Sequence, residues 1–231
     1  MSLRTACQWL ASLLVLIAAL PATAQTPPGA DEVARYGGLH AAAWQGDAGR
    51  NARLLAAGTD PNSRDGHGRT PLHVATFARR RDAILALAKG GADLGLLEND
   101  RYDAVTIAAV ADDEDTLRLL LQLGASARLT TSRYDGTALI AAAHLGHDGV
   151  VRQLIAAGAP LDHVNNLHWT ALIESIVLGQ GGPRHVATLR ALVDAGADTR
   201  LADRQGRTPL ALARERGYAE MVAILVAAGA R

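Results

Sequence analysis

Histidines are the residues of this sequence best suited to chemistry, and four of the eight form two close pairs. His144 and His147 are three positions apart, and His163 and His168 are five apart. Two imidazoles at positions i and i+3 of a helix share one face, where they could bind a transition metal. Neither pair has a cysteine or carboxylate that completes a recognisable ligand set. The sequence therefore predicts no metal site and no cofactor.

Nucleophile and phosphate-binding motifs are not found either. The sequence contains no G-x-S-x-G motif, no phosphate-cradling loop and no Ser/His/Asp pattern. Its 23 Lys and Arg residues are balanced by 23 Asp and Glu residues, so there is no basic surplus for neutralising phosphates. We therefore expect a protein that is not an enzyme and has no nucleic-acid partner.

Residues 1–24 have the order of a secretory signal peptide. Arg4 precedes the apolar run LASLLVLIAAL, which is followed by Pro21 and an A-x-A triplet ending at Ala24. The run is too short to span a bilayer comfortably, although an uncleaved N-terminal anchor is the alternative. We expect cleavage after Ala24, no membrane attachment afterwards, and a periplasmic or secreted protein. Cys7, the only cysteine, would leave with the signal peptide, so the mature chain would have no disulfide.

The rest of the chain is organised as a repeat. Equivalent apolar positions recur at intervals of 33, 33, 34, 33 and 38 residues: Leu39, Leu72, Val105, Leu139, Leu172 and Leu210. The glycines that close the units recur at intervals of 33, 33, 34, 38 and 33 residues: Gly58, Gly91, Gly124, Gly158, Gly196 and Gly229. Each unit contains a short Ala-rich stretch followed by apolar residues at helical spacing. Neither helix can bury its apolar face alone, so the units must stack.

These units resemble the ankyrin repeat family. The resemblance is clearest in RTPLHVA (residues 69–75) and in DGTALIAAAHLGHDGVVRQLIAAGAPLD (residues 135–162), which match the family's T-P-L-H-x-A signature and period. It covers residues 38–231 in six units, after a lead segment at 25–37. It implies an all-α solenoid of six stacked helix-turn-helix units with projecting hairpin loops, in an exported bacterial protein that we expect to be a monomer.

The repeat register argues against a catalytic role for His73, the histidine of the first motif. Its equivalents in the other units are His40, Thr106, Ile140, Ile173 and Ala211. A catalytic group is not expected at a position that is apolar in half of the units. In the ankyrin family the Thr/His pair bonds locally and fixes the start of the inner helix, and the resemblance implies this role for Thr70 and His73.

Glu174 and the segment GQGGPRH (residues 179–185) depart from the repeat. The sibling units have apolar residues where Glu174 stands: Val74, Ile107, Ala141 and Leu212. A carboxylate at a core position needs a partner. We favour a structural pair with Arg184 or His185, and the alternative is a carboxylate that faces a ligand. The segment lengthens the turn between the two helices of the fifth unit by about five residues, and is either an interaction loop or a tolerated surface loop.

Two charge runs stand at equivalent places in neighbouring units. RRRD (residues 79–82) and DDED (residues 112–115) are 33 residues apart, so stacking should place the basic turn of the second unit beside the acidic turn of the third. Exposed ion pairs of this kind are each worth about 0.2–1 kcal/mol. We interpret these runs as structural.

Ankyrin arrays typically bind other proteins through their concave face, which the inner helices and the hairpin loops form. Aromatic residues with arginines nearby are typical of an interface hot region. The residues expected on this face are Trp44, Phe77, Arg69, Tyr102, Tyr134, His144, His168, Trp169, Arg207 and Glu215. We therefore expect a non-catalytic periplasmic module that binds another protein. The alternative is an inhibitor or immunity-type protein that blocks a partner enzyme.

Overall fold

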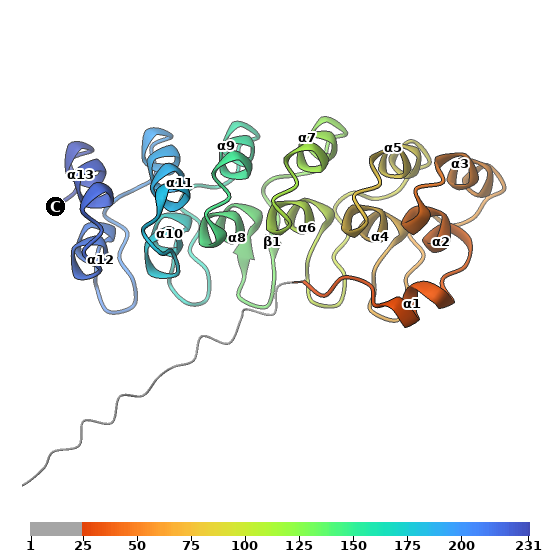
Figure 1. The fold of residues 1–231 in the computed structure, drawn as a ribbon, viewed down its shortest axis with the longest axis horizontal. Coiled ribbons are helices and arrows are strands. Elements are labelled where there is room, and N and C mark those ends of the chain that lie inside the picture. The colour runs from red at the N-terminus through yellow and green to blue at the C-terminus, as the bar shows by residue number, and fades with distance from the viewer. Residues whose placement is uncertain (1–24) are drawn as a thin grey trace, which may run out of the picture.

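Six pairs of helices stand side by side in the computed structural model, which describes residues 25–231 (Figure 1). The inner helices are α2(Gly38–Gln45), α4(Pro71–Phe77), α6(Ala104–Val110), α8(Ala138–Leu145), α10(Ala171–Val177) and α12(Pro209–Glu215). The outer helices are α3(Ala48–Ala56), α5(Arg81–Lys89), α7(Glu114–Gln122), α9(Asp148–Ala156), α11(Pro183–Asp194) and α13(Ala219–Ala227). Each inner helix and the outer helix that follows it form one unit, numbered 1 to 6 along the chain, and each hairpin loop is counted with the inner helix that it precedes. The expected signal peptide lies outside the described residues.

The lead segment adds one short helix, α1(Ala30–Arg35), before unit 1. In Figure 1 it lies below α2 and α4, and its chain begins beneath α6. None of the helices within residues 25–231 has the length and apolar character needed to cross a bilayer.

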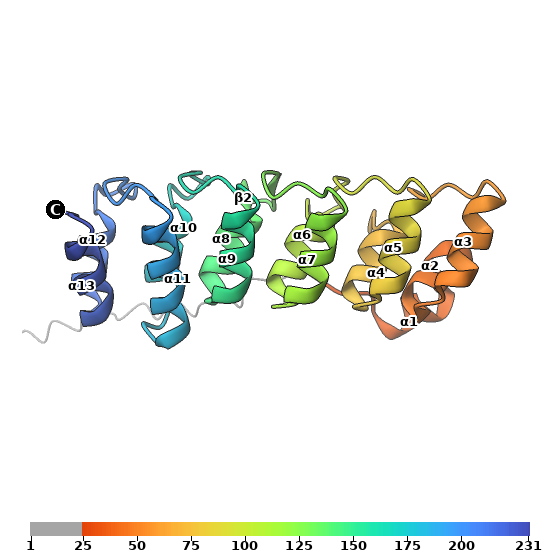
Figure 2. The same cartoon turned by 90° about the horizontal axis from the view of Figure 1, so that it is seen from above.

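Hairpin loops connect each outer helix to the next inner helix and lie along one edge of the array (Figure 2). One of them contains strands, β1(Thr130–Thr131) and β2(Gly136–Thr137), which pair antiparallel with Thr130 opposite Thr137. Backbone hydrogen bonds join neighbouring loops: Asn99 N to His67 O at 3.0 Å, Ser132 N to Arg101 O at 2.8 Å, and Asn166 N to Tyr134 O at 3.0 Å. The loops therefore form a continuous hydrogen-bonded edge from unit 2 to unit 5.

Threonine side chains cap the starts of four inner helices, among them α4, where Thr70 was predicted to do so. Thr70 accepts a hydrogen bond from the His73 amide, and Thr137, Thr170 and Thr208 cap α8, α10 and α12 in the same way. The His73 Nδ1 accepts from the Thr70 amide at 3.0 Å, and its Nε2 lies 3.0 Å from the Leu96 carbonyl oxygen. Burial lowers the pKa of His73 to about 4, so this imidazole is neutral at pH 7. The structural role predicted for Thr70 and His73 is confirmed.

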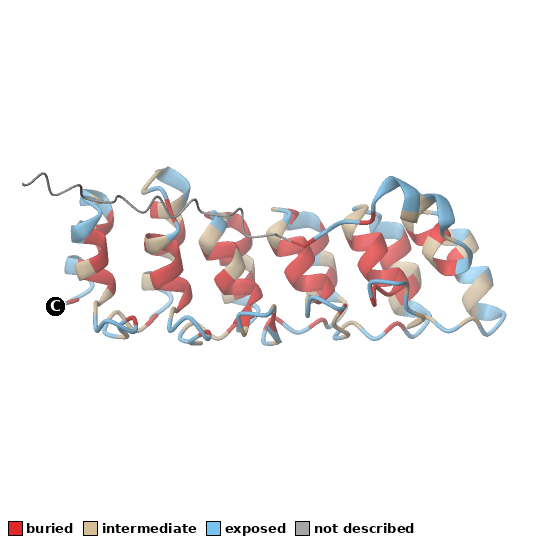
Figure 3. Ribbon diagram, turned by 90° about the horizontal axis from the view of Figure 1, so that it is seen from below, coloured by how far each residue is buried: buried red, intermediate tan, exposed pale blue. Residues whose placement is uncertain are grey.

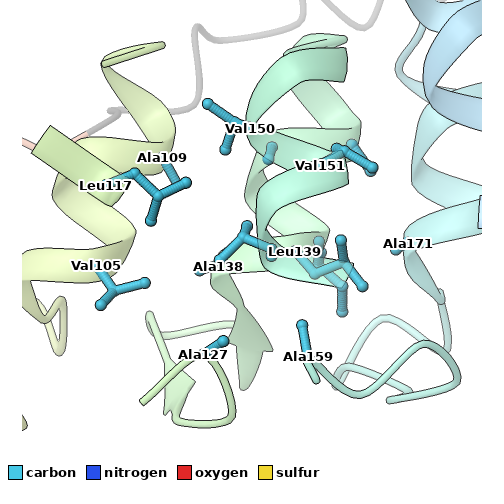
Figure 4. Packing of buried hydrophobic residues seen from close by; sticks show 14 of the residues in the cluster. Val105, Ala109, Leu117, Ala127, Ala138, Leu139, Val150, Val151, Ala159 and Ala171 are labelled. Carbon is cyan, nitrogen blue, oxygen red and sulfur yellow. The ribbon is translucent and has the colours of Figure 1, made fainter. Parts of the chain in front are cut away.

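The core consists of the repeated apolar positions and of alanines between the helices. The six aligned residues Leu39, Leu72, Val105, Leu139, Leu172 and Leu210 are at most 2% exposed. Small side chains such as Ala109 and Ala138 lie between larger ones at the junctions of units 3 to 5 (Figure 4), which lets the helices approach closely. Buried residues occupy the helix faces that meet the neighbouring units (Figure 3). The predicted solenoid is confirmed.

The extra residues of unit 5 do not form only a longer loop. The turn before α11 spans residues 178–182, against 78–80 before α5, and α11 has 12 residues where α5 has 9. The expectation of a turn lengthened by five residues is therefore wrong in part, because most of the insertion extends the helix. Pro183 at the first position of α11 explains this, since its fixed backbone angle and missing N–H suit a helix start.

The two charge runs lie side by side as predicted. The Arg79 Nε and the Arg81 Nη1 are each 3.6 Å from a carboxylate oxygen of Asp113. Asp113 also caps α7 by accepting from the Thr116 amide at 3.1 Å. This carboxylate therefore stabilises both the helix start and the junction between units 2 and 3.

Candidate functional site

The predicted binding residues divide between the ends of inner helices and the hairpin loops. Trp44, Phe77, His144 and Glu215 lie in the last turns of α2, α4, α8 and α12. The hairpin loops contain Arg69, Tyr102, Tyr134, His168, Trp169 and Arg207. Among them, Tyr134 is 45% exposed and Arg69 only 2%. These residues are distributed from unit 1 to unit 6, and they differ greatly in how far another molecule can reach them.

The bases of two hairpin loops hold the same arginine–aspartate pair. In unit 2, the Arg69 Nε donates to Asp65 Oδ2 at 2.8 Å, and the Arg69 amide donates to Asp65 Oδ1 at 2.9 Å. In unit 6, Arg207 makes the same two bonds to Asp203 at 2.8 and 2.9 Å. Burial raises the pKa of Asp65, but hydrogen bonds from Tyr36 and Arg69 outweigh it and lower the pKa overall. Both pairs are therefore ionised at neutral pH.

The lead segment covers the first of these arginines. The Arg69 Nη2 lies 3.0 Å from Glu32 Oε1, and its Nη1 donates to the Thr26 carbonyl at 3.3 Å. Glu32 Oε1 also contacts the His67 imidazole, and the Tyr36 hydroxyl donates to Asp65 at 2.7 Å. A cleft of about 440 Å³ remains between the lead segment and the loop of unit 2. No pattern in the sequence predicts this contact between the lead segment and the loop of unit 2.

Arg207 has no such cover. Its Nη1 lies 3.2 Å from Glu215 of α12, and 41% of its side chain is exposed. The residue equivalent to Glu215 in unit 2 is Phe77, so the second carboxylate that Arg69 contacts comes from the lead segment instead. The same loop chemistry is thus enclosed at one end of the array and accessible at the other.

Glu174 has a different partner from the one that we predicted. It is 4% exposed, and its Oε1 accepts from the Asn165 Nδ2 at 3.0 Å. Arg184 instead pairs with Asp112 and Asp148, and the His185 imidazole contacts the His144 carbonyl. The predicted pair with Arg184 or His185 is therefore wrong. Asn165 lies in the hairpin loop, whereas the insertion follows the opposite end of α10, so the two candidates lie on the wrong side of Glu174.

The second carboxylate oxygen of Glu174 faces His144, whose Nδ1 is 3.7 Å from Oε2. Burial raises the pKa of Glu174 to about 7, although the Asn165 hydrogen bond opposes the rise. Burial, together with the nearby His185 and His147, lowers the pKa of His144. The site can therefore gain or lose a proton near neutral pH. Within residues 25–231, no group of three or more His, Cys, Asp or Glu side chains is placed to hold a metal ion.

Two exposed apolar residues of the hairpin loops are not among the predicted binding residues. Val164 and Leu167 are 46% and 39% exposed in the loop of unit 5, next to the loop that holds Tyr134. The signal was present in HVNNLHW, where two aliphatic residues interrupt an otherwise polar loop. His168 follows Leu167 with φ of 64°, at the position that Gly68 and Gly206 occupy in units 2 and 6 and that Arg101 and Asp135 occupy, also with positive φ, in units 3 and 4. The turn of the hairpin loop therefore requires this conformation in each of these units, and a non-glycine residue adopts it at a cost in strain.

Comparisons with known proteins agree with this architecture. The family model for ankyrin repeats (3 copies) matches residues 39–131, 107–199 and 139–231. The protein YahD of Escherichia coli (strain K12), an ankyrin repeat protein by name, is 35% identical over 190 residues, which is 82% of this chain and 94% of YahD. An ankyrin repeat domain from Acinetobacter baumannii AYE superposes with a TM-score of 0.79 at 42% identity, covering 84% of this chain and 98% of that domain.

A second similar structure contains a complex. One chain in the structure of a predatory endopeptidase from Bdellovibrio bacteriovorus in complex with an immunity protein gives a TM-score of 0.68 at 25% identity. The match covers 83% of this chain and 98% of that chain.

Proposed function

Because the chain belongs to the ankyrin repeat family, we propose that it is a non-catalytic module of the bacterial periplasm that binds a partner protein on its concave face. The part of the face that units 4 to 6 form carries the main contact. The observation behind this assignment is the exposure of Tyr134, Val164 and Leu167 on two hydrogen-bonded hairpin loops. Exposed apolar side chains that lie close together are typical of interaction sites.

The histidines support binding rather than catalysis. Ring nitrogens of His40, His147 and His163 lie 2.6 to 3.0 Å from backbone carbonyl oxygens of neighbouring units. A ring held in this way has one nitrogen committed to the junction between repeats. These imidazoles therefore stabilise the stack, as His73 does.

His168 offers a sharp test of the binding surface. Replacing it with glycine removes the imidazole and relieves the left-handed strain, so stability should stay the same or rise slightly. We expect the partner that the unaltered protein captures from a periplasmic extract to bind His168→Gly, Tyr134→Ala and Leu167→Ala more weakly. Arg128→Ala and Arg152→Ala are controls, because we place both residues away from the concave face. Equal capture by all five variants would contradict the assignment to units 4 to 6.

A second function has a specific observation in its favour. The similar structure with an immunity protein contains an enzyme, which supports the alternative that this chain blocks a partner enzyme. The captured partner should then lose activity when the purified protein is added in equimolar amount. A partner whose activity is unchanged or raised would favour the interaction module.

The periplasmic location rests on residues 1–24, and mass spectrometry of the exported protein tests it. The chain should begin at Gln25, in the periplasmic fraction. Recovery of a chain that begins at Met1 from the membrane fraction would replace this location with a membrane anchor. Size-exclusion chromatography of the same sample tests whether the protein is a monomer.

A further inference from the structure

The lead segment has well-defined contacts with the concave face rather than lying loosely beside it. Gln25 and Pro28 are buried, whereas Thr26 and Pro27 between them are exposed. The chain passes beneath α4 and turns into α1 below α2 (Figure 1). Residues 25–36 thus occupy part of the surface that this family uses for its partners.

The contacts are those with which a peptide is recognised. The Arg69 Nη1 donates a hydrogen bond to the main-chain carbonyl of Thr26, and its Nη2 forms an ion pair with the Glu32 carboxylate. The His67 imidazole contacts the same carboxylate. A hydrogen bond to the main chain combined with an ion pair to a side chain fixes the direction of the bound segment. Hydrogen bonding from the Gly29 amide, followed by the effects of Arg69 and His67, lowers the pKa of Glu32.

Unit 6 shows that the arginine does not need this cover. Arg207 keeps the same bonds to its aspartate with no lead segment over it. The loop of unit 2 is therefore complete without residues 25–36, and the Glu32 and Thr26 contacts are additional. A segment that binds in addition to a complete loop can be replaced by another segment of the same chemistry.

We propose that residues 25–36 are an intramolecular ligand of the concave face at units 1 to 3, and that an acidic peptide of a partner binds there by displacing them. The displacing segment presents a carboxylate and a main-chain carbonyl to Arg69 and His67. The lead segment thereby competes with such a partner, whereas the surface at units 4 to 6 stays open. This inference rests on the proposed function, because it concerns the partner of the same face.

The test uses a fluorescent peptide with the sequence of residues 25–37, QTPPGADEVARYG, and the purified protein. In Glu32→Gln, the side-chain oxygen can still accept from the Gly29 amide, but the carboxylate that faces Arg69 is lost. We expect this variant to bind the peptide about tenfold more tightly than the unaltered protein does, because its own lead segment competes less well. A peptide that itself carries Glu32→Gln should bind the variant about tenfold more weakly.

Asp31→Asn is the matched control, because it removes the same charge from an exposed neighbouring residue. It should bind the peptide as the unaltered protein does. Trypsin gives a second readout, since cleavage after the exposed Arg35 should be several-fold faster in Glu32→Gln than in Asp31→Asn. No peptide binding to Glu32→Gln up to about 1 mM would overturn the proposal, because linked segments compete at about this effective concentration. Equal trypsin rates would also overturn it.

The peptide experiment needs no partner, so its failure is distinct from a failure of the proposed function. If the peptide does not bind but a partner is captured through the loops of units 4 and 5, the interaction module stands and the self-occupied site is wrong. If the peptide binds and no protein is captured from the extract, the self-occupied site stands and the proposed function is wrong.

Discussion

The hairpin loops of units 2 and 5 have the same backbone hydrogen bonds at their bases but different side-chain pairs there. Unit 2 has an aspartate–arginine pair, and unit 5 has an asparagine–glutamate pair. Asp65 and Asn165 both accept amide hydrogen bonds from the residues two and four positions ahead. In unit 2 the aspartate pairs with Arg69. In unit 5 the equivalent of Arg69 is Trp169, and the Asn165 amide is free to donate to Glu174. An aspartate at position 165 would instead place two carboxylates together. Asn165 and Glu174 in unit 5 therefore replace the aspartate and the apolar residue of the other units as a matched pair.

This comparison shows how a repeat array varies its chemistry without changing its backbone. Unit 2 is built from charged groups that neutralise each other beneath the lead segment. Unit 5 holds a buried carboxyl that titrates near pH 7 and is flanked by exposed apolar residues. We therefore expect charge deletions to affect unit 2 most strongly, and changes of pH to affect unit 5.

The largest effect is expected for Arg69→Ala. This change removes the buried cation that the partly buried Asp65 and Glu32 carboxylates share, and removing one partner of a buried ion pair typically costs about 3–5 kcal/mol. Urea denaturation at pH 7 measures the loss. Arg207→Ala is the matched control and should destabilise clearly less, because water can reach the place of its half-exposed guanidinium.

A double-mutant cycle isolates the contribution of the lead segment to this loss. In the Arg69→Ala background, Glu32→Gln should have little further effect, because its main partner is already gone. Equal losses for Arg69→Ala and Arg207→Ala, with additive effects of Glu32→Gln, would show that the lead segment adds nothing to unit 2.

The titration of Glu174 gives the next largest effect. Its folded pKa of about 7 lies above the ordinary 4.5, so the folded state binds more protons than the unfolded chain between these values. Stability therefore falls as pH rises from about 4.5 to 7, by up to about 3 kcal/mol. Glu174→Gln keeps an acceptor for Asn165 and cannot ionise. The variant should match the unaltered protein near pH 4 and exceed it in stability near pH 8.

Subtracting the two denaturation curves at each pH removes the other carboxyls from the comparison. Asp148, for example, has a lowered pKa, because hydrogen bonds from Arg152 and Arg184 outweigh its burial. Its contribution is lost only towards acid pH and is common to both proteins. A stability difference that does not change between pH 4 and pH 8 would mean that folding leaves the pKa of Glu174 at its ordinary value. A difference that moves in favour of the unaltered protein as the pH rises would mean that the folded pKa is lowered, with His144 as the cation.

The loss of partner-binding free energy should differ between the two halves of the concave face, units 4 to 6 and units 1 to 3, by less than these stability effects. Tyr134→Ala is expected to weaken partner binding by about 2 kcal/mol, as truncated hot-spot residues do. Tyr102→Ala should cost less, because Tyr102 is half-buried in the loop of unit 3, at the end of the array that the lead segment occupies. Isothermal titration with the captured partner measures both. A larger loss for Tyr102 would move the main contact to units 1 to 3.

The fold was predictable because each unit repeats its own local signals. Thr70, Thr137, Thr170 and Thr208 mark the helix starts, and the closing glycines adopt φ from 77° to 95°, as their place at a helix end requires. The lead segment lies outside the repeat register. Its contacts with Arg69 span 37 and 43 positions of sequence, and no periodic pattern announces them.

The sequence does contain a signal for the partner of Glu174, in contrast to the contacts of the lead segment. The register places Asn165 where units 2 and 6 have aspartate, and this exchange together with a buried glutamate indicates a donor for the carboxylate. Nearness in the chain to a basic residue suggested Arg184 instead. Pro183 likewise signalled that part of the insertion is helical. Substitutions at equivalent positions have to be interpreted together, because the side chains of a repeat meet across loops as well as along helices.

The smallest effect is expected for Arg184, which forms ion pairs between α11 of unit 5 and residues of units 3 and 4. Its Nη2 lies 2.8 Å from Asp112 in unit 3, and its Nε lies 3.3 Å from Asp148 in unit 4. The side chain is 53% exposed, so Arg184→Gln should cost about 0.2–1 kcal/mol at low salt, and almost nothing at 1 M salt, where the Debye length is about 3 Å. Arg190→Gln is the control, because its single contact with Glu220, at 3.7 Å, reaches only unit 6. A larger and more salt-dependent loss for Arg184 would show that the extended α11 joins three units, whereas equal, salt-independent losses would mean that the insertion merely lengthens one helix.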